Sequence, residues 1–501
     1  MAFLGFGLLH AGWAFAAPYD GPPDEQMHAL RAAGIMQGEV IAPDSRIQTV
    51  PSSLDKNNVQ RPNGSWQHQV CFPMQVNVPA DCAEGPGGDQ TLVGRYVTEA
   101  RFNPVYYAFT GWPLKFWPEW KGIILARLLT SAAMAALLAC AVVAGSRWTR
   151  HRSLVAGIVV AVTPMTAHLA GSINPNGVEI AAGVALFAAL IAVVHEQREG
   201  VNRAAVALAG VSASILVTPR FSGVMWLMII LGVILVPSSW ARLKVLMRSR
   251  TVQVWSAVVI LATIASVAWT MAMGTAALGS GNNGWTTNQL LRFALIDMWP
   301  NVTNQMIGVM GWAETLMPRL IYVVWFMAAG LLLLGGLALG NLVDRWRLVA
   351  LFFGTFTPLL GMELLLVNDV GWFNQGRYFL PGAVGLPMLA ALIMARRGIA
   401  AEQMRSITRL LAFLLLPIHV VCLAYTMTRW QSGLAILNPF KGSWTPPYGT
   451  VVPLALGLVG AVVLFIAYWQ ASSITPVPAA VTEQADEEPA AAAPKPETVS
   501  V

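Results

Sequence analysis

The sequence predicts an all-α protein that crosses a membrane about 12 times. Of its 501 residues, 56% are hydrophobic and only 11% are charged, whereas soluble domains carry about 25% charged residues. Apolar segments long enough to span a bilayer recur along the chain and are separated by short polar connections. The net charge of +6 comes largely from Lys and Arg in these connections. No basic run interleaved with aromatic residues predicts nucleic-acid binding.

The chain is expected to divide into four parts. Residues 1–17 form a retained first helix, and residues 18–121 form a long polar loop that carries short helices. Residues 122–470 form a transmembrane bundle, and residues 471–501, which are rich in Pro, Ala and Glu, form a disordered tail. The bundle's spans are predicted at 122–145, 153–170, 177–194, 203–217, 221–236, 252–274, 319–340, 348–367, 379–395, 408–426 and 450–469.

The distribution of basic residues predicts the orientation in the membrane. Alternate connections hold 15 and 5 Lys or Arg residues. The first set is 146–152, 195–203, 238–251, 341–348 and 396–409; the second is 171–176, 218–220, 275–318, 368–378 and 427–449. Because Lys and Arg are enriched in cytoplasmic loops, the first set is expected inside a cytoplasmic membrane, with both chain termini. The 18–121 loop and the active face are then expected outside.

Ionisable groups cluster directly after the first apolar segment, in residues 21–31. Two prolines are expected in the first turn of a short helix, with Asp24 and Glu25 beside the positive end of its dipole. Helical spacing places Asp24, His28 and Arg31 on one face. A capped, charged surface helix is the alternative interpretation.

Cys71 and Cys82 share the first polar loop, with no Cys-x-x-Cys or His spacing for zinc. Outside the cytoplasm, a disulfide between them is expected. We see no cluster of carboxylates that predicts a metal site.

Further polar groups are predicted near the outer face. Asn176 and Glu179 have the spacing of a capping box at a helix start. Arg220 follows a Thr-Pro turn and either snorkels outward or faces the protein interior. Arg377 and Tyr378 open a span, where the planar guanidinium suits a phosphate; an interfacial anchor pair is the alternative.

Two more groups lie in or near apolar spans. Glu363 must be protonated or paired there, and Arg220 or Arg377 is its expected partner. His168 is expected to be a packed histidine rather than a catalyst. Together with the opening helix, these residues predict a polar cavity that faces outward.

Three stretches resemble the signature of a bacterial multi-pass family known as domain of unknown function 2142. They are Pro22-Pro23-Asp24-Glu25-x-x-His28, Ile173-Asn174-Pro175-Asn176-Gly177 and Gln375-Gly376-Arg377-Tyr378-Phe379-Leu380-Pro381. The resemblance covers roughly residues 1–430. That family in turn resembles the C-type fold (GT-C) of integral-membrane glycosyltransferases. Those enzymes transfer a sugar from a polyprenyl-phosphate donor to an acceptor outside the cytoplasmic membrane.

The resemblance implies a role for each matching residue. Asp24 would be the catalytic carboxylate, with Glu25 as the second choice and His28 as its neighbour, and Arg377 with Tyr378 would contact the donor phosphate. The other candidate contacts to the donor are Arg31, Arg220, Asn174, Asn176 and Glu179. No metal or cofactor is expected, since a polyprenyl phosphate is itself a good leaving group. The expected partners are the lipid-linked donor, an envelope glycan or lipid acceptor, the bilayer and, through the tail, other proteins; no nucleic acid is expected.

Two other functions fit the same sequence. A transporter or flippase for an envelope lipid or polysaccharide would also have about 12 spans, although the long first loop and the lack of internal repeats argue against it. A non-catalytic scaffold for envelope assembly is the third interpretation. Replacing Asp24 by Asn separates an enzyme, which would lose turnover, from a scaffold, which would tolerate the change.

Overall fold

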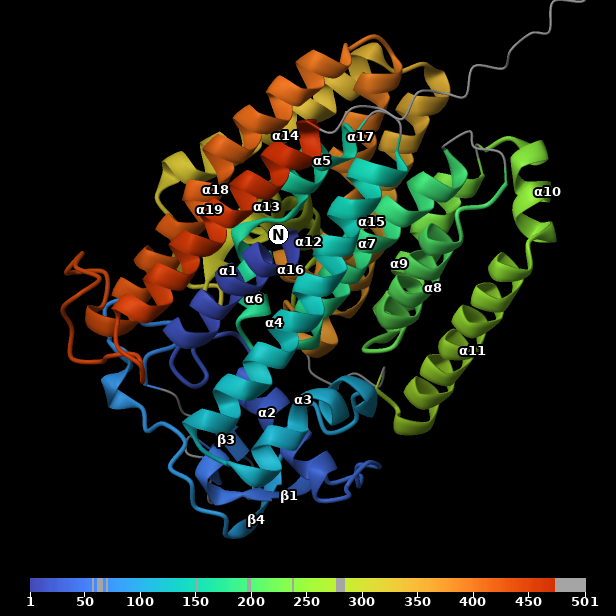
Figure 1. The fold of residues 1–501 in the computed structure, drawn as a ribbon. Helices are drawn as coiled ribbons and strands as arrows, with labels where there is room; N and C mark the ends of the chain where they lie inside the picture. Colours follow the sequence, from blue (N-terminus) through green and yellow to red (C-terminus); the bar gives the residue numbers. More distant parts are fainter. Residues whose placement is uncertain are drawn as a thin grey trace, which may run out of the picture.

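The structure, a computed structural model, describes residues 1–55, 58–60, 66–68, 71–149, 152–195, 200–236, 238–275 and 284–473. Long helices form a bundle, and a lobe of short helices and strands lies at one end of it (Figure 1). The predicted tail lies outside the described residues from 474 onward.

The main helices of the bundle are α1 (Ala2–Ala16), α4 (Trp120–Val143), α5 (Leu154–Ala161), α6 (Pro164–Ala170), α7 (Pro175–Val194), α8 (Arg203–Val217), α9 (Phe221–Leu235), α11 (Arg250–Met273), α14 (Arg319–Leu339), α15 (Leu342–Val370), α16 (Gly376–Ala383), α17 (Gly385–Arg396), α18 (Ala401–Ser432) and α19 (Val451–Ser473). Shorter helices are α2 (Glu25–Met36), α3 (Pro104–Phe116), α10 (Trp240–Arg248), α12 (Thr287–Arg292) and α13 (Met298–Gly308).

The all-α membrane class is confirmed. Among the described residues, eight helices are long and apolar enough to cross a membrane, and α1, α8 and α9 are shorter apolar helices. A total of 12 spans is not confirmed, because the predicted span 153–170 is two short helices, α5 and α6. The break falls before Pro164, which opens α6 at a position where its missing N–H leaves no bond unmade.

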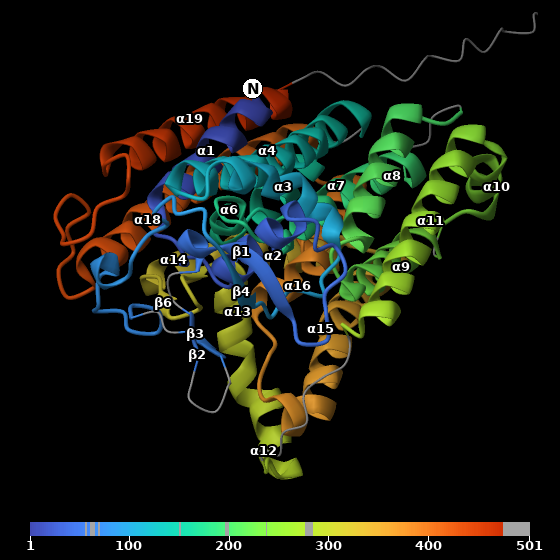
Figure 2. The same ribbon diagram turned by 90° about the horizontal axis from the view of Figure 1, so that it is seen from below.

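The centre of the bundle is formed by α7 and the α16–α17 pair, which are almost completely buried. Around them, α1 packs between α4 and α19, while α5 contacts α17 and α18. The edge helix α11 leaves most of its apolar surface exposed, as a lipid-facing helix would. Figures 1 and 2 show α10 and α11 along one side of the molecule, away from α1 and α19.

The first loop contains strands that the sequence interpretation did not include. Strand β1 (Ile47–Pro51) pairs antiparallel with β4 (Leu92–Tyr96), and Ile47 lies opposite Tyr96. A shorter antiparallel pair in the same loop is β2 (Asn58–Gln60) with β3 (Trp66–His68). A third pair, β5 (Val309–Met310) with β6 (Thr315–Leu316), lies between α13 and α14. Helices α2 and α3 pack on each other above β1 (Figure 1).

A disulfide and a buried arginine attach the loop to the bundle. Cys71 and Cys82 are joined in the structure. Arg429 of α18 donates to the carbonyl oxygens of Phe72 at 2.5 Å and Val78 at 2.9 Å, both within the disulfide loop. Its Nε also lies 3.2 Å from a carboxylate oxygen of Glu314. These contacts hold the disulfide loop against the end of α18.

Candidate functional site

Asp24 lies at the N-cap of α2 in a left-handed backbone conformation, with φ of 61°. The helix begins at Glu25, so the prediction that the two prolines occupy its first turn is wrong: both precede the helix. Left-handed backbone is unfavourable for a residue with a Cβ and is often retained at functional sites. Its main-chain carbonyl accepts the His28 N–H at 3.1 Å, while its side chain leaves the helix end uncapped. The carboxylate is thereby directed to another element.

That element is the start of α16, which carries Arg377. Nη2 of Arg377 lies 2.5 Å from Oδ2 of Asp24 and donates to the Tyr378 hydroxyl at 3.1 Å. Gly376 permits the close approach of α16 to α13, because a Cβ there would run into the Val302 carbonyl oxygen. The Gly376 N–H also donates to Gln305 at 2.7 Å. The first and third sequence motifs therefore meet in an ion pair.

Arg377 is only 2% exposed, yet it keeps unused hydrogen-bonding capacity. Its Nε and Nη1 have no hydrogen-bond partner within the part of the chain that the structure describes. Buried guanidinium donors without partners are costly and are normally satisfied. The two free donors are consistent with a site for an anion.

Arg220 provides a second positive charge, and it faces the protein interior rather than snorkelling outward. Its guanidinium lies 5.2 Å from the centre of the Tyr378 ring and 5.7 Å from that of Phe102. Burial opposes its charged form, but the carboxylates of Glu179 and Asp24, with neighbouring tyrosines, raise its pKa. Its Nε also lacks a partner among the described residues.

The neighbouring arginines determine the ionisation of Asp24. Burial acts to raise its pKa, but the positive charges of Arg377 and Arg220 outweigh burial and hold the pKa below its usual value. Asp24 is thus a carboxylate at neutral pH. Its side chain retains 29% exposure, which leaves it open to a molecule entering from outside the protein.

His28 and Glu99 complete the polar lining. Nδ1 of His28 lies 2.8 Å from the Tyr107 hydroxyl, and its Nε2 has no described partner. Burial and the neighbouring arginines lower the pKa of His28 to about 3, so it is neutral. Burial and the negative charge of Asp24 raise the pKa of Glu99 to about 7.

Glu25 has a different environment from its neighbour Asp24. Its carboxylate forms a bidentate pair with Arg127 of α4, at 2.7 Å and 2.5 Å, and both side chains are fully buried. The Ile173 N–H donates to the same carboxylate at 3.1 Å. Arg127 also donates to the carbonyl oxygens at the end of α1, those of Ala14, Ala17 and Pro18. Glu25 therefore joins the opening motif to the bundle and is not available as a base.

The second sequence motif, residues 173–177, packs against the residues that precede Asp24. Nδ2 of Asn174 donates to the Pro23 carbonyl at 3.0 Å, and its Oδ1 caps α7 by accepting the Asn176 N–H at 3.0 Å. The predicted capping box of Asn176 and Glu179 is wrong, because α7 already begins at Pro175 and Asn174 is its N-cap. Instead, the Asn176 side chain donates to Glu179 at 3.1 Å.

Two predicted contacts are not formed. Arg31, expected on the same helix face as Asp24 and as a contact to the donor, instead donates to the carbonyl oxygens of Glu39, Val40 and Phe102 and so stabilises the loop. Glu363 pairs with neither Arg220 nor Arg377. Its carboxylate accepts the main-chain N–H groups of Phe373 and Asn374, at 2.7 Å and 3.0 Å, because α15 turns back there toward α16.

Sequence reasoning missed three contributors: Arg127, Glu99 and Tyr107. Arg127 had a usable signal, since a lone arginine inside the apolar span 122–145 requires a buried partner. Tyr107 and Glu99 had no such signal, because only tertiary packing brings α3, which carries Tyr107, and the preceding turn, which carries Glu99, to α2. The assembled site includes the ionised Asp24 carboxylate, the Glu99 carboxyl group with its raised pKa, the neutral His28, and the guanidinium groups of Arg220 and Arg377.

Comparisons with known proteins give one family and one structural likeness. No curated protein matches the chain. Two crystal structures are similar, both of ArnT from Cupriavidus metallidurans. The one bound to undecaprenyl phosphate has a TM-score of 0.42 and 13% identity, over 94% of this chain and 76% of that one. The apo structure has a TM-score of 0.37 and 12% identity, over 92% and 74%.

The family match covers most of the chain. The model of the family described as predicted membrane protein (DUF2142) matches residues 6–386, which include all three motifs that form the site. This chain is a member of the DUF2142 family of predicted membrane proteins.

Proposed function

We propose that this protein is a membrane glycosyltransferase that moves a sugar from a polyprenyl-phosphate donor to an envelope acceptor outside the cytoplasm. The observation that carries the proposal is the contact between Asp24 and Arg377, beside Arg220. It places an ionised carboxylate directly against a site with two positive charges and unused donors. A base next to an anion site is what sugar transfer from a phosphate requires.

Asp24 fits the role of the base. In the proposed step, an acceptor hydroxyl attacks the anomeric carbon of the donor while its proton passes to the Asp24 carboxylate. A new carbon–oxygen bond forms, and the bond from the anomeric carbon to the phosphate oxygen breaks, so that its electron pair leaves with the phosphate. The low pKa of Asp24 keeps it deprotonated at neutral pH, and its basicity would rise once Arg377 turns to the donor phosphate.

Arg377 and Arg220 fit the role of the phosphate site. A guanidinium holds phosphate oxygens with charge-assisted hydrogen bonds, and these strengthen as the leaving phosphate gains negative charge. Both guanidinium groups lie near the Tyr378 ring, 5.1 Å (Arg377) and 5.2 Å (Arg220) from its centre. A lipid-linked donor suits the proposed location, because nucleotide sugars are not available outside the cytoplasm.

Donor binding would also release the base. In the structure, Arg377 is paired with Asp24. A phosphate that takes up the donors of Arg377 would compete with Asp24 for the same guanidinium and leave the carboxylate free for the acceptor proton. The proposal therefore includes an order of events, in which the donor binds before the acceptor is activated.

The test is transfer of a radiolabelled sugar from a set of polyprenyl-phosphate donors by purified protein in proteoliposomes. We expect Asp24→Asn to lower kcat by roughly 10²–10⁴-fold without raising the donor KM, because it removes the carboxylate that competes with the phosphate for Arg377. Arg377→Lys should raise the donor KM, because an ammonium group lacks the planar fork. The matched control is Asp44→Asn, which alters an exposed aspartate of the same loop. An Asp24→Asn variant as active as this control would contradict the assignment, and wild type inactive with every donor would contradict the donor class.

A further inference from the structure

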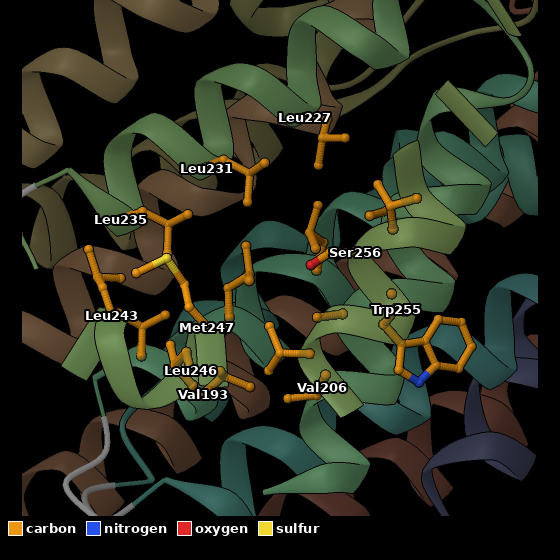
Figure 3. Close-up of a pocket in the computed structure, with 18 of the residues that line it drawn as sticks. Val193, Val206, Leu227, Leu231, Leu235, Leu243, Leu246, Met247, Trp255 and Ser256 are labelled. Atoms are coloured by element: carbon orange, nitrogen blue, oxygen red, sulfur yellow. The ribbon is translucent and has the colours of Figure 1, made fainter. Parts of the chain in front are cut away.

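An apolar cavity of about 470 Å³ lies between helices α7 to α11 (Figure 3). Its walls come from the last turns of α7 and α9 and the first turns of α8 and α11, and α10 closes one side. Leucine and valine side chains dominate the lining, and Leu227, Leu231 and Leu235 lie along one wall (Figure 3). Gly210 lets the Trp255 ring pack against α8 and form the opposite wall.

The helix that closes this cavity is amphipathic. Trp240, Leu243 and Met247 of α10 line the cavity, at the spacing of one helical face. Lys244 and Arg248 flank that face and are exposed, and Nζ of Lys244 lies 5.8 Å from the centre of the Trp240 ring. A short helix with an apolar face, an interfacial tryptophan and flanking basic residues is typical of the membrane–water boundary.

The same end of the cavity has a strongly positive surrounding. No acidic residue occurs in the sequence between Glu199 and Asp297. Lys244, Arg248 and Arg250 lie within seven residues of one another, and none of them forms an ion pair with any residue that the structure describes. Basic groups at the cytoplasmic end of apolar helices attract anionic lipid headgroups.

We propose that this cavity binds an anionic phospholipid of the surrounding bilayer. An acyl chain would fill the space between α8, α9 and α11, and the phosphate headgroup would lie among Lys244, Arg248 and Arg250. Charge complementarity selects an anionic lipid over a zwitterionic one, while the absence of charged groups from the lining selects a hydrocarbon chain.

The cavity is distinct from the candidate active site. The cavity reaches Ala213 and Leu227, each seven residues from Arg220, but its basic end lies farther away. Arg220 precedes the first residue of α9, whereas α10 follows its last, and the 15 residues of α9 correspond to about 22 Å along the helix axis. A phosphate held by Arg220 and Arg377 therefore cannot also contact the basic residues of α10. The inference does not rest on the proposed glycosyl transfer.

The experiment uses the full-length protein in phosphatidylcholine vesicles that contain phosphatidylglycerol with a diazirine on one acyl chain. Phosphatidylcholine with the same diazirine is the zwitterionic comparison. After irradiation, mass spectrometry of peptides from α9 and α11 measures the labelling. We expect the anionic lipid to label these peptides more strongly than the zwitterionic one. Each basic residue replaced in the K244Q/R248Q/R250Q variant should lower that labelling roughly fivefold at low ionic strength.

Matched variants separate the cavity from general membrane contact. Leu231→Trp fills part of the cavity with an indole ring and should lower labelling there. Leu334→Trp, on the exposed face of α14, should leave the labelling unchanged. R345Q/R405Q, which removes basic residues on α15 and α18, should leave the labelling unchanged. Equal labelling by both lipids, or no effect of K244Q/R248Q/R250Q, would overturn the proposal. Displacement of the label by a polyprenyl phosphate, but not by unlabelled phosphatidylglycerol, would also overturn it.

Discussion

Replacing each of the adjacent carboxylates Asp24 and Glu25 by its amide should have opposite consequences. Asp24→Asn should abolish most activity and leave the fold intact, whereas Glu25→Gln should destabilise the fold. The reason is the environment: the Glu25 carboxylate is fully buried against Arg127, while the Asp24 side chain is 29% exposed.

The magnitudes follow from these contacts. Removing one charge of a buried, hydrogen-bonded pair costs about 3–5 kcal/mol, because the remaining charge stays buried without compensation. Glu25→Gln leaves the positive charge of Arg127 buried without a counter-charge, although the new amide oxygen can still accept the Ile173 N–H. Asp24→Asn keeps an oxygen that can accept from Arg377, and the side chain is 29% exposed, so its cost should be smaller than that of Glu25→Gln.

Reversible unfolding in mixed detergent micelles measures the free energy of both variants, and sugar transfer is then normalised to folded protein. A double-mutant cycle of Glu25→Gln with Arg127→Met should show a coupling of about 0.5–3 kcal/mol, since the double variant buries no unpaired charge. Additive effects, or a Glu25→Gln cost below that of Asp24→Asn, would refute the reasoning.

Three further predictions concern separate parts of the structure. The raised pKa of Glu99 means that its ionisation opposes folding, so the free energy of unfolding should fall as pH rises from 4.5 to about 7; Glu99→Gln should flatten this dependence, which denaturant titrations at several pH values would measure. Arg429→Met should cost about 3–5 kcal/mol and make a further Cys71→Ser change less harmful than in wild type, since both hold the same loop; additive losses in thermal unfolding would count against this. Gly157→Ala should destabilise by about 1–3 kcal/mol, because a Cβ there meets the α17 backbone, whereas the control Gly330→Ala meets nothing; equal melting temperatures would contradict the packing.

Periodicity and hydrophobicity predicted most of the bundle, because helices in a membrane must satisfy their own backbone hydrogen bonds and leave a clear apolar signal. The same signal could not separate α5 from α6, since the break at Pro164 leaves both pieces apolar. The strands β1 and β4 also had no signal, because their residues combine polar side chains with irregular exposure.

The candidate site was predictable in its residue types but not in its pairings. Asp24, Arg220, Arg377 and Tyr378 were identified from local motifs, and the structure brings them together. The roles of Glu25 and Arg31 depend on groups that lie far away in the sequence or on main-chain carbonyls, and no motif describes these. Long-range ion pairs require the tertiary packing that creates them.

The Asp24–Arg377 pair connects the fold to the proposed chemistry. A carboxylate that was permanently paired would be a weak base, and one that was never paired would leave Arg377 buried without a counter-charge. The proposed exchange would resolve both problems: a donor phosphate would replace Asp24 as the anionic partner of Arg377, and Asp24 would be released only on donor binding. The left-handed backbone at Asp24 supports this exchange, because it holds the carboxylate at the helix end, free of capping bonds that would compete for it.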